Sequence, residues 1–535
     1  MRLIRLMIRA KGGQAQPGAC LRLLGPMRSL AGALAIFACA GSMALWASVA
    51  AAQGQPRSAG AALPTLGDTG ELSVGAERRL GERIARELLR DPDFLDDPVL
   101  GDYVQQLWLP LLAAARQRGE LVPDMDERFA WRILLGRDRS INAFALPGGW
   151  LGMHLGLISA TASRDEVAAV LAHELSHVTQ RHISRMMTQD SRVSPLLMGA
   201  MILGAAVAAR NPAMGQAVLT GSQAVAVRSQ LNFSRDMERE ADRVGFGVLV
   251  QAGFEPEGVV AMFERLAQAS RLNDDGSFPY LRTHPLTTER IADMRARIPV
   301  QSAGRGPVRV DLLHGLAAAR ARALSATGVD GLRVLLRETQ ALTPDAPLVR
   351  QAGALYGGAL ASLKLRDLPQ ALRLHERLAR LDLGDPEAAR LVRLLGGEIA
   401  LAAGNAADAL AAAGMRTSAR PELLLSAQAL LLSANAEAAA QAADRLQLWV
   451  GDHPADAIAW QLLAQAQSAR GLPLRALRAE AEARVAVLDY AAAIDRLRAA
   501  QNLARRGTND HIEASIIDAR SHQIASLLRE QAAQR

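Results

Sequence analysis

The stretch LAHELSHVTQRH, residues 171–182, carries the residue types of a metal-dependent hydrolase. In a helix, His173 and His177 lie one turn apart on the same face, so both imidazoles can bind one ion. Zinc suits this pair, and a catalytic zinc site keeps one position open for water. Glu174 can then act as the general base for that water. The spacing therefore predicts a catalytic zinc site on this helix.

Two histidines and a water leave one ligand unassigned, and the best candidate lies in SRDMEREAD, residues 234–242. Glu238 and Asp242 are four residues apart and share a helical face, whereas Glu240 points elsewhere. Glu238 would bind the metal, and Asp242 would orient a ligand imidazole. The alternative is a solvated helix whose acids pair with Arg235, Arg239 and Arg243.

Neighbouring elements must position the zinc helix, and the sequence indicates both helices and strands. Residues 71–118 have the apolar spacing of helices with a break at DPDFLDDP, and DEVAAVLA continues into the zinc helix. Residues 128–138 and 141–158 carry apolar and aromatic runs that predict strands, with Pro-Gly-Gly at 147–149 as a turn. Residues 142–153 form either an edge strand that binds extended substrate or a strand paired on both sides.

HELSH with the downstream EREAD resembles the gluzincin peptidases related to the CAAX-prenyl and heat-shock membrane proteases. The segment NAFALPGGWLGMHLGLI before the zinc helix also matches that family. The resemblance covers about residues 70–300 and implies a mostly helical zinc-peptidase domain with a small sheet. It implies one zinc ion per chain, with Glu238, which opens the second motif, as the third protein ligand.

The segment YLRTHPLTTERI places His284 and Arg290 downstream of these ligands. Both residue types can stabilise an oxyanion next to zinc. Alternatively, His284 occupies the open zinc position and holds the enzyme latent, or only caps the helix after Pro285. Related peptidases carry a similar Thr-His-Pro segment, and we expect His284 to line the active site. His182 is expected at the surface or at a helix cap, and no ligand role is expected for His154, His375 and His453.

Residues 1–52 have the features of an export signal. They contain six Lys or Arg residues and no acid, and an apolar run from Leu30 to Ala52 ends in small residues that suit cleavage. The alternative is an uncleaved membrane anchor. Both interpretations place the body of the protein in the periplasm.

The surplus of positive charge lies in that leader. The chain has 61 Lys and Arg against 54 Asp and Glu, and removing the leader's six leaves 55 against 54, a balance of +1. Nucleic-acid binding needs clustered positive charge, so we expect no nucleic-acid partner. Both cysteines, Cys20 and Cys39, also lie in the leader, so zinc elsewhere must be bound by histidine and carboxylate.

Two segments beside the expected peptidase domain have unusual composition. Residues 53–69 are rich in Gly, Pro and Ala and are expected to be a flexible segment. Residues 195–227 contain apolar stretches that are too short to span a bilayer. They form either a buried helical hairpin or a hydrophobic lid that contacts a membrane surface.

Residues 310–505 are rich in Ala and Leu, with helical spacing and short turns. Prolines recur there at intervals of 33 to 39 residues: Pro347, Pro386, Pro421 and Pro454. This period predicts tetratricopeptide-like helix pairs, with a plain helical bundle as the alternative, and residues 506–535 read as a C-terminal helical tail. The predicted fold class is α+β: a mostly helical zinc-peptidase domain with a small sheet, then an all-α tetratricopeptide-repeat solenoid.

The leader, motifs and repeats together resemble a periplasmic branch of this family. They predict a periplasmic zinc endopeptidase whose repeats dock protein clients or an assembly machine. The clients implied by the resemblance are misfolded or stalled outer-membrane proteins. The alternative is a chaperone or adaptor with a little-used zinc site. The Gly-rich stretch QSAGRGP near residue 305 predicts that catalysis and docking can be separated there.

Overall fold

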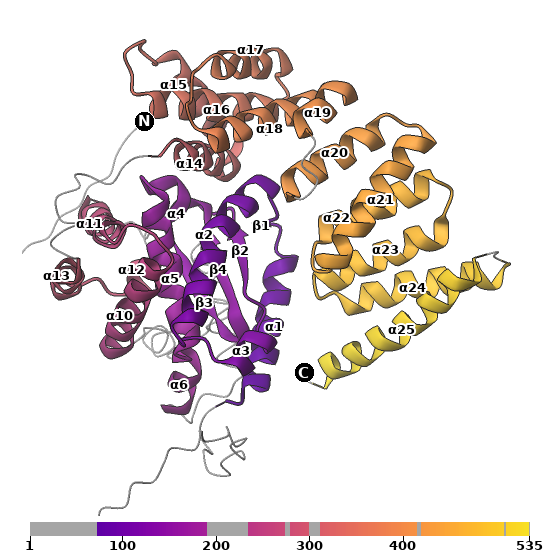
Figure 1. Ribbon diagram of the computed structural model, residues 1–535, viewed down its shortest axis with the longest axis horizontal. Helices are drawn as coiled ribbons and strands as arrows, with labels where there is room; N and C mark the ends of the chain where they lie inside the picture. The colour runs from indigo at the N-terminus through magenta and orange to yellow at the C-terminus, as the bar shows by residue number, and fades with distance from the viewer. Residues whose placement is uncertain are drawn as a thin grey trace, which may run out of the picture. The chain divides into compact units, whose positions relative to one another are not determined.

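A computed structural model describes residues 72–189, 234–272, 279–298, 311–414, 419–507 and 510–533 (Figure 1). Four expected features lie outside these residues: the leader 1–52, the flexible segment 53–69, the apolar segment 195–227 and the linker near residue 305. Among the described helices, none combines the length and apolar character needed to cross a bilayer. All described residues fall within one compact unit, residues 67–535.

Four short strands form the sheet of the peptidase part: β1 (Phe94–Leu95), β2 (Arg132–Gly136), β3 (Ala143–Leu146) and β4 (Trp150–His154). Their order is β1-β2-β4-β3, with β2 and β4 parallel and the other pairs antiparallel. Of residues 142–153, β3 thus lies at an edge of the described sheet, while β4 is paired on both sides. The turn between them is the expected Pro-Gly-Gly, here the short helix η1 (Pro147–Gly149).

Ten helices are described around this sheet: α1 (Val74–Arg90), α2 (Pro98–Gln117), α3 (Pro123–Arg128), α4 (Leu155–Ala160), α5 (Arg164–Thr179), α6 (His182–Gln189), α10 (Arg235–Gln251), α11 (Glu257–Leu272), α12 (Pro279–Thr283) and α13 (Thr288–Arg297). The central helix is α5, which packs against α2, α10, α11 and β3. Fourteen of its 16 residues are buried, as expected for a helix surrounded by other elements. Its start is capped by Ser163, whose hydroxyl accepts from the N–H of Glu166.

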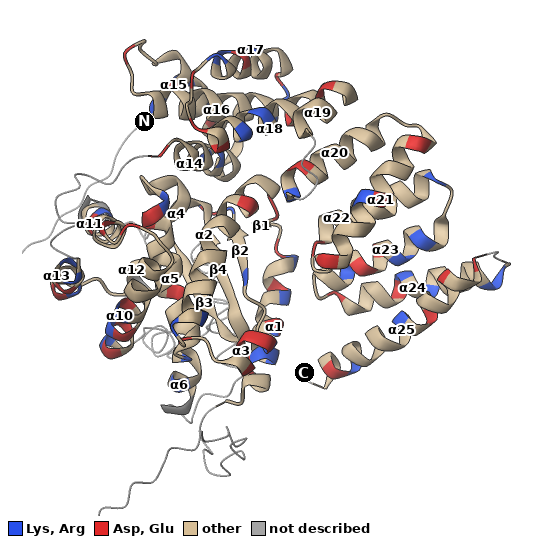
Figure 2. Ribbon diagram, in the orientation of Figure 1, with Lys and Arg blue, Asp and Glu red and all other residues tan. Residues whose placement is uncertain are grey.

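Within the described residues, the chain is helical from residue 311 onward: α14 (Leu312–Ser325), α15 (Gly328–Gln340), α16 (Leu348–Lys364), α17 (Leu368–Ala379), α18 (Pro386–Ala402), α19 (Ala406–Ala413), α20 (Arg420–Leu432), α21 (Ala436–Asp452), α22 (Ala457–Ala469), α23 (Pro473–Ala486), α24 (Tyr490–Arg505) and α25 (His511–Ala532). Consecutive helices mostly pack against one another, and the expected tail, α25, packs against α24 and α23. Figure 2 shows acidic and basic residues interspersed along α20 to α25. The coarse prediction of a mostly helical α+β chain with a small sheet is confirmed.

The helical region and the peptidase part share a hydrophobic core. One cluster of buried apolar residues includes Val99 of α2, Leu175 of α5 and Leu425 of α20. Helix α14 packs against α4, and its His314 lies with Nδ1 2.7 Å from the Tyr103 hydroxyl. The change of composition near residue 305 therefore does not coincide with a division of the core.

Ion pairs also join the two regions at the start of α2, and the pair of Arg320 with Asp97 is buried. Arg320 of α14 is 4% exposed and donates to both carboxylate oxygens of Asp97, at 2.8 and 2.7 Å, and to Glu398 at 2.8 Å. Arg390 donates to Asp102 at 2.7 Å, and Arg420 donates to Asp96 at 2.6 Å. Three arginines of the helical region thus bind acids at one end of the peptidase part.

Candidate metal centre

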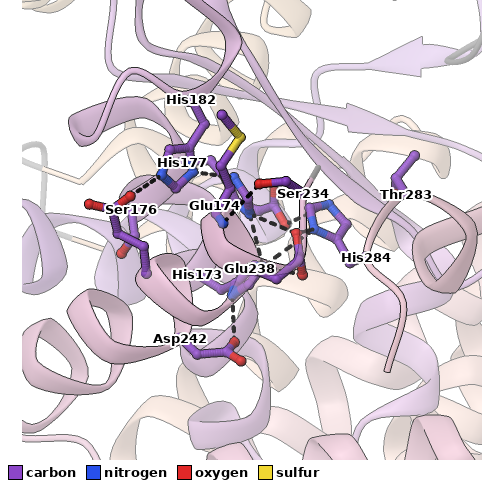
Figure 3. A network of polar contacts seen from close by, with 12 residues as sticks. His173, Glu174, Ser176, His177, His182, Ser234, Glu238, Asp242, Thr283 and His284 are labelled. Carbon is purple, nitrogen blue, oxygen red and sulfur yellow. Dashed lines mark hydrogen bonds and ion pairs between the residues drawn. The ribbon is translucent and has the colours of Figure 1, made fainter. Parts of the chain in front are cut away.

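Four buried side chains from α5, α10 and the end of α12 converge at one point (Figure 3). They are His173, His177, Glu238 and His284, and one ligand atom of each lies within 4.8 Å of the others. His173 Nε2 and His177 Nε2 are 3.0 Å apart. Glu238 Oε1 lies 3.4 Å from His177 Nε2, and Glu238 Oε2 lies 3.6 Å from His173 Nε2. The structure therefore brings together the three side chains expected as ligands.

The spacing and chemistry of these donors fit a divalent metal ion. Donors about 2.0–2.1 Å from a tetrahedral ion lie about 3.4 Å apart, and the distances around Glu238 and the two histidines bracket that value. Burial lowers the pKa of His177 well below its ordinary value, which leaves a neutral imidazole able to bind metal. Burial would raise the pKa of Glu238, but His284, His177 and His173 lower it overall, so Glu238 is a carboxylate.

Glu174 has a buried carboxylate with no hydrogen-bond partner among the described residues. The residue is fully buried, and neither carboxylate oxygen accepts a hydrogen bond from a described group. The nearby polar group is His284, whose Nε2 lies 3.5 Å from Glu174 Oε1. A buried carboxylate without hydrogen bonds is costly, so a further polar group is expected to bind here. A water molecule at the converging ligands would meet this need.

Helix α10 can approach α5 closely because Gly245 has no side chain at the contact. A Cβ on Gly245 would lie 3.0 Å from the carbonyl oxygen of Ala172 and 3.2 Å from His173 Cα. Ser234 caps the start of α10 by accepting from the N–H of Met237. The cap and the glycine contact hold the first turns of α10 against the residues that carry the histidines.

Asp242 lies against the side of His173 that faces away from the converging ligands. Its Oδ1 is 3.0 Å from His173 Nδ1. Arg290 donates to both oxygens of Asp242, at 2.7 and 2.8 Å, and its Nη1 lies 2.7 Å from Glu238. Burial would raise the pKa of Asp242, but His173 and Arg290 lower it overall, so this carboxylate is charged. The buried partner of Asp242 is therefore Arg290, and not one of the α10 arginines that the solvated-helix alternative would pair with it.

His284 lies among the ligands rather than at a helix cap. It is 1% exposed, and its Nδ1 lies 2.9 Å from Glu238 Oε1 and 3.3 Å from His173 Nε2. Its ring stacks on Tyr280 at a centroid distance of 4.6 Å. Burial would lower the pKa of His284, but Glu238 and Glu174 raise it overall. The capping alternative is wrong, because Thr287 caps the following helix.

The expectation that His182 lies at the surface or at a helix cap is wrong. The side chain is fully buried, with Nδ1 2.8 Å from His177 Nδ1 and Nε2 3.1 Å from Glu240 Oε2. The sequence prediction treated residues 173–182 as one continuous helix, and helical spacing then placed His182 off the face that carries the ligands. Instead, α5 ends at Thr179 and Arg181 adopts a φ of 53°. The chain therefore turns back, which no spacing in the sequence indicates.

The other histidines without an expected ligand role bind elsewhere. His154 Nδ1 lies 2.9 Å from the Ser140 hydroxyl, and His375 Nε2 lies 2.9 Å from the Val392 carbonyl oxygen. His453 stacks on Trp449 at 3.7 Å. They are not part of the group of converging ligands.

Comparison with known proteins decides the family. A family model described as peptidase family M48 matches residues 122–298, which include α5, α10 and His284. Residues 122–298 belong to peptidase family M48. The gluzincin assignment made from HELSH and EREAD is therefore confirmed.

The relatives of this chain fall into two groups by name. The beta-barrel assembly-enhancing protease of Escherichia coli (strain K12) is 28% identical over 471 residues, covering 87% of this chain and 91% of that protein. A Vibrio cholerae relative named for the same activity is 35% identical over 237 residues, covering 44% of this chain and 47%, about half, of that protein. The mitochondrial metalloendopeptidase OMA1 of Arabidopsis thaliana is 30% identical over 195 residues, covering 36% of each chain. The protein is a metalloendopeptidase, as predicted.

Proposed function

We propose that this M48 protein is a periplasmic zinc endopeptidase that acts on outer-membrane proteins during their assembly and quality control. The observation that carries the proposal is the buried convergence of His173, His177 and Glu238 beside the buried carboxylate of Glu174, which accepts no hydrogen bond from a described group. The name of the E. coli relative, which aligns with 87% of this chain, supports the substrate class. The export features of residues 1–52 support the location.

Each side chain of the centre has a distinct role in this proposal. His173, His177 and Glu238 would hold one zinc ion, which supplies a Lewis acid for the scissile carbonyl and lowers the pKa of a water. Glu174 accepts the proton of the attacking water and passes it to the leaving amine. Asp242, held by Arg290, accepts from Nδ1–H of His173 and so directs Nε2 to the ion.

Strand β3 is the proposed platform for the substrate backbone. It pairs with β4 on one side and has no strand partner on the other within the described sheet, and it packs against α5. An extended peptide can add to such an edge through main-chain hydrogen bonds that tolerate many side chains. This mode suits unfolded proteins, which present extended backbone of varied sequence.

The consecutive helices from α14 onward are proposed to be tetratricopeptide repeats that dock clients or assembly machinery. Their packing against chain neighbours and the proline period support this assignment. Contact with a membrane surface through residues 195–227 is part of the proposal, and its support is the apolar composition of that segment.

The substrate class is tested with the purified chain and an unfolded outer-membrane β-barrel protein. We expect zinc-loaded protein to cleave the unfolded substrate, a metal chelator to stop cleavage, and added zinc to restore it. The same β-barrel folded in detergent is the control and should resist cleavage, because its strand edges are paired. No cleavage by a zinc-loaded chain would instead favour the chaperone or adaptor.

His284 has two proposed roles that one variant separates. As a fourth ligand it would hold the enzyme latent, and as an oxyanion partner it would support the reaction. Its position 3.3 Å from His173 Nε2 favours the ligand. We therefore expect His284→Ala to cleave the unfolded substrate faster than the unmodified protein. Slower cleavage at unchanged zinc content would assign the oxyanion role instead.

A further inference from the structure

His182, which lies outside the HELSH and EREAD motifs, contacts the proposed zinc-binding helix α5 just after the chain leaves that helix. Helix α5 ends at Thr179, and α6 begins at His182. Between them Arg181 has a φ of 53°, a left-handed conformation that residues other than glycine rarely adopt. The side chain of Arg181 binds buried Glu77 at 3.0 Å and the carbonyl oxygen of Leu72. Strained backbone held in this way is frequent at functional sites, and here it turns His182 back onto His177.

The contacts of His182 form a continuous chain away from the ligands. Its Nδ1 lies 2.8 Å from Nδ1 of His177, the nitrogen remote from the other ligands. Its Nε2 lies 3.1 Å from Oε2 of Glu240, and Arg185 donates to the same oxygen at 2.8 Å. His182 is fully buried, while the side chain of Glu240 is 28% exposed. Figure 3 shows His182 beside His177.

The two short contacts of His182, with His177 and with Glu240, are compatible with one arrangement of protons. A His177 that binds metal through Nε2 carries its proton on Nδ1 and donates it. His182 Nδ1 must then accept, which leaves the proton of His182 on Nε2, where it is donated to Glu240. Arg185 in turn donates to Glu240 and keeps it a carboxylate acceptor.

We propose that His182 and Glu240 are positioning residues that fix the ring orientation and tautomer of the metal ligand His177. The inference rests on the proposed zinc site. With this assignment, each of the two histidine ligands on α5 has a partner at Nδ1: Asp242 for His173 and His182 for His177. The two supports differ, because a charged carboxylate holds one ring and a neutral imidazole backed by a carboxylate holds the other.

The proposal is tested by zinc affinity, measured on the full chain by competition with a chromophoric chelator. His182→Leu keeps a similar volume but cannot accept a hydrogen bond, and we expect it to weaken zinc binding about 10- to 100-fold. His182→Asn places an amide oxygen near the position of Nδ1 and should restore affinity to within about threefold. The cobalt-substituted proteins add a spectroscopic readout: the Leu variant should show an altered visible spectrum and the Asn variant a native one.

Glu240, whose side chain is 28% exposed, offers a second test if His182→Leu does not fold. Glu240→Ala should weaken zinc binding several-fold, because His182 loses the acceptor that fixes its tautomer. Asp236→Ala removes the same charge from the same helix at a side chain that is 93% exposed, and should leave affinity unchanged. Unchanged zinc affinity in Glu240→Ala, or in a folded His182→Leu, overturns the proposal. Absence of zinc binding in the unmodified protein would overturn the proposed function instead.

Discussion

Glu174→Gln is expected to reduce cleavage of an unfolded protein substrate by about 10²- to 10⁴-fold, the range that a general base contributes. The amide has the shape of the carboxylate but cannot take a proton from the attacking water. No described group donates a hydrogen bond to Glu174, so the substitution breaks no such bond in the described structure. Zinc content and the melting temperature should therefore stay near the values of the unmodified protein. Cleavage rate and metal content are measured on the same preparation.

This variant also separates the protease from the chaperone or adaptor. In cells, a protease loses its effect on outer-membrane protein assembly with Glu174→Gln, whereas a chaperone keeps it. Because the inactive variant retains zinc and the edge strand, it should also hold substrates long enough for capture. Undiminished cleavage by Glu174→Gln would remove Glu174 from the reaction.

Arg320→Ala is expected to lower the free energy of unfolding by about 3–5 kcal/mol, the cost of breaking a buried ion pair on one side. Arg320 is 4% exposed and Asp97 is 8% exposed, so removing the guanidinium leaves a carboxylate buried without its cation. Tyr356 also loses the donor that lies 3.2 Å from its hydroxyl. Urea unfolding followed by circular dichroism measures the change.

Arg322→Ala is the matched control on the same helix. Its partner is Glu338, and both side chains are partly exposed, at 42% and 36%, whereas Arg320 and Asp97 are buried. An exposed pair contributes at most about 1 kcal/mol, so this variant should unfold close to the unmodified protein. Equal effects of the two substitutions would show that the Arg320 pairs do not join the two regions energetically.

The shared core changes how docking by the repeats must be tested. Helix α14 buries Leu316 and Ala317 in the same apolar cluster as Leu157 of α4. A chain ending near residue 305 would expose that surface, so loss of partners after truncation would not identify the docking region. Substitutions of exposed residues in the full chain avoid this, for example at Leu448, which is 77% exposed.

The chemistry of the centre could be predicted because local spacing encodes it. Helical periodicity put His173 and His177 on one face, and the same rule put Glu238 and Asp242 on one face of a second helix. That the two faces meet depends on the close approach at Gly245, which spacing does not reveal. The family resemblance supplied that connection.

Features made by long-range contacts could not be predicted. His182 reaches His177 only because Arg181 adopts a left-handed conformation held by Glu77, 104 residues earlier in the chain. The pairs of Arg320 with Asp97 and Glu398 join residues 223 and 78 positions apart, and sequence patterns carry no signal at such separations. The two-residue strand β1 is likewise too short to produce an alternation of apolar residues.

Elemental metal analysis of the purified chain and two variants tests the proposed zinc site. We expect one zinc per chain in the unmodified protein and in Asp236→Ala, and less than about a tenth of that in Glu238→Ala, which loses one of three protein ligands. Both cysteines, Cys20 and Cys39, lie within residues 1–52, so residues 53–535 offer zinc no thiolate ligand. Full zinc content in Glu238→Ala would show that Glu238 is not a ligand, and no zinc in the unmodified protein would show that the centre does not bind zinc.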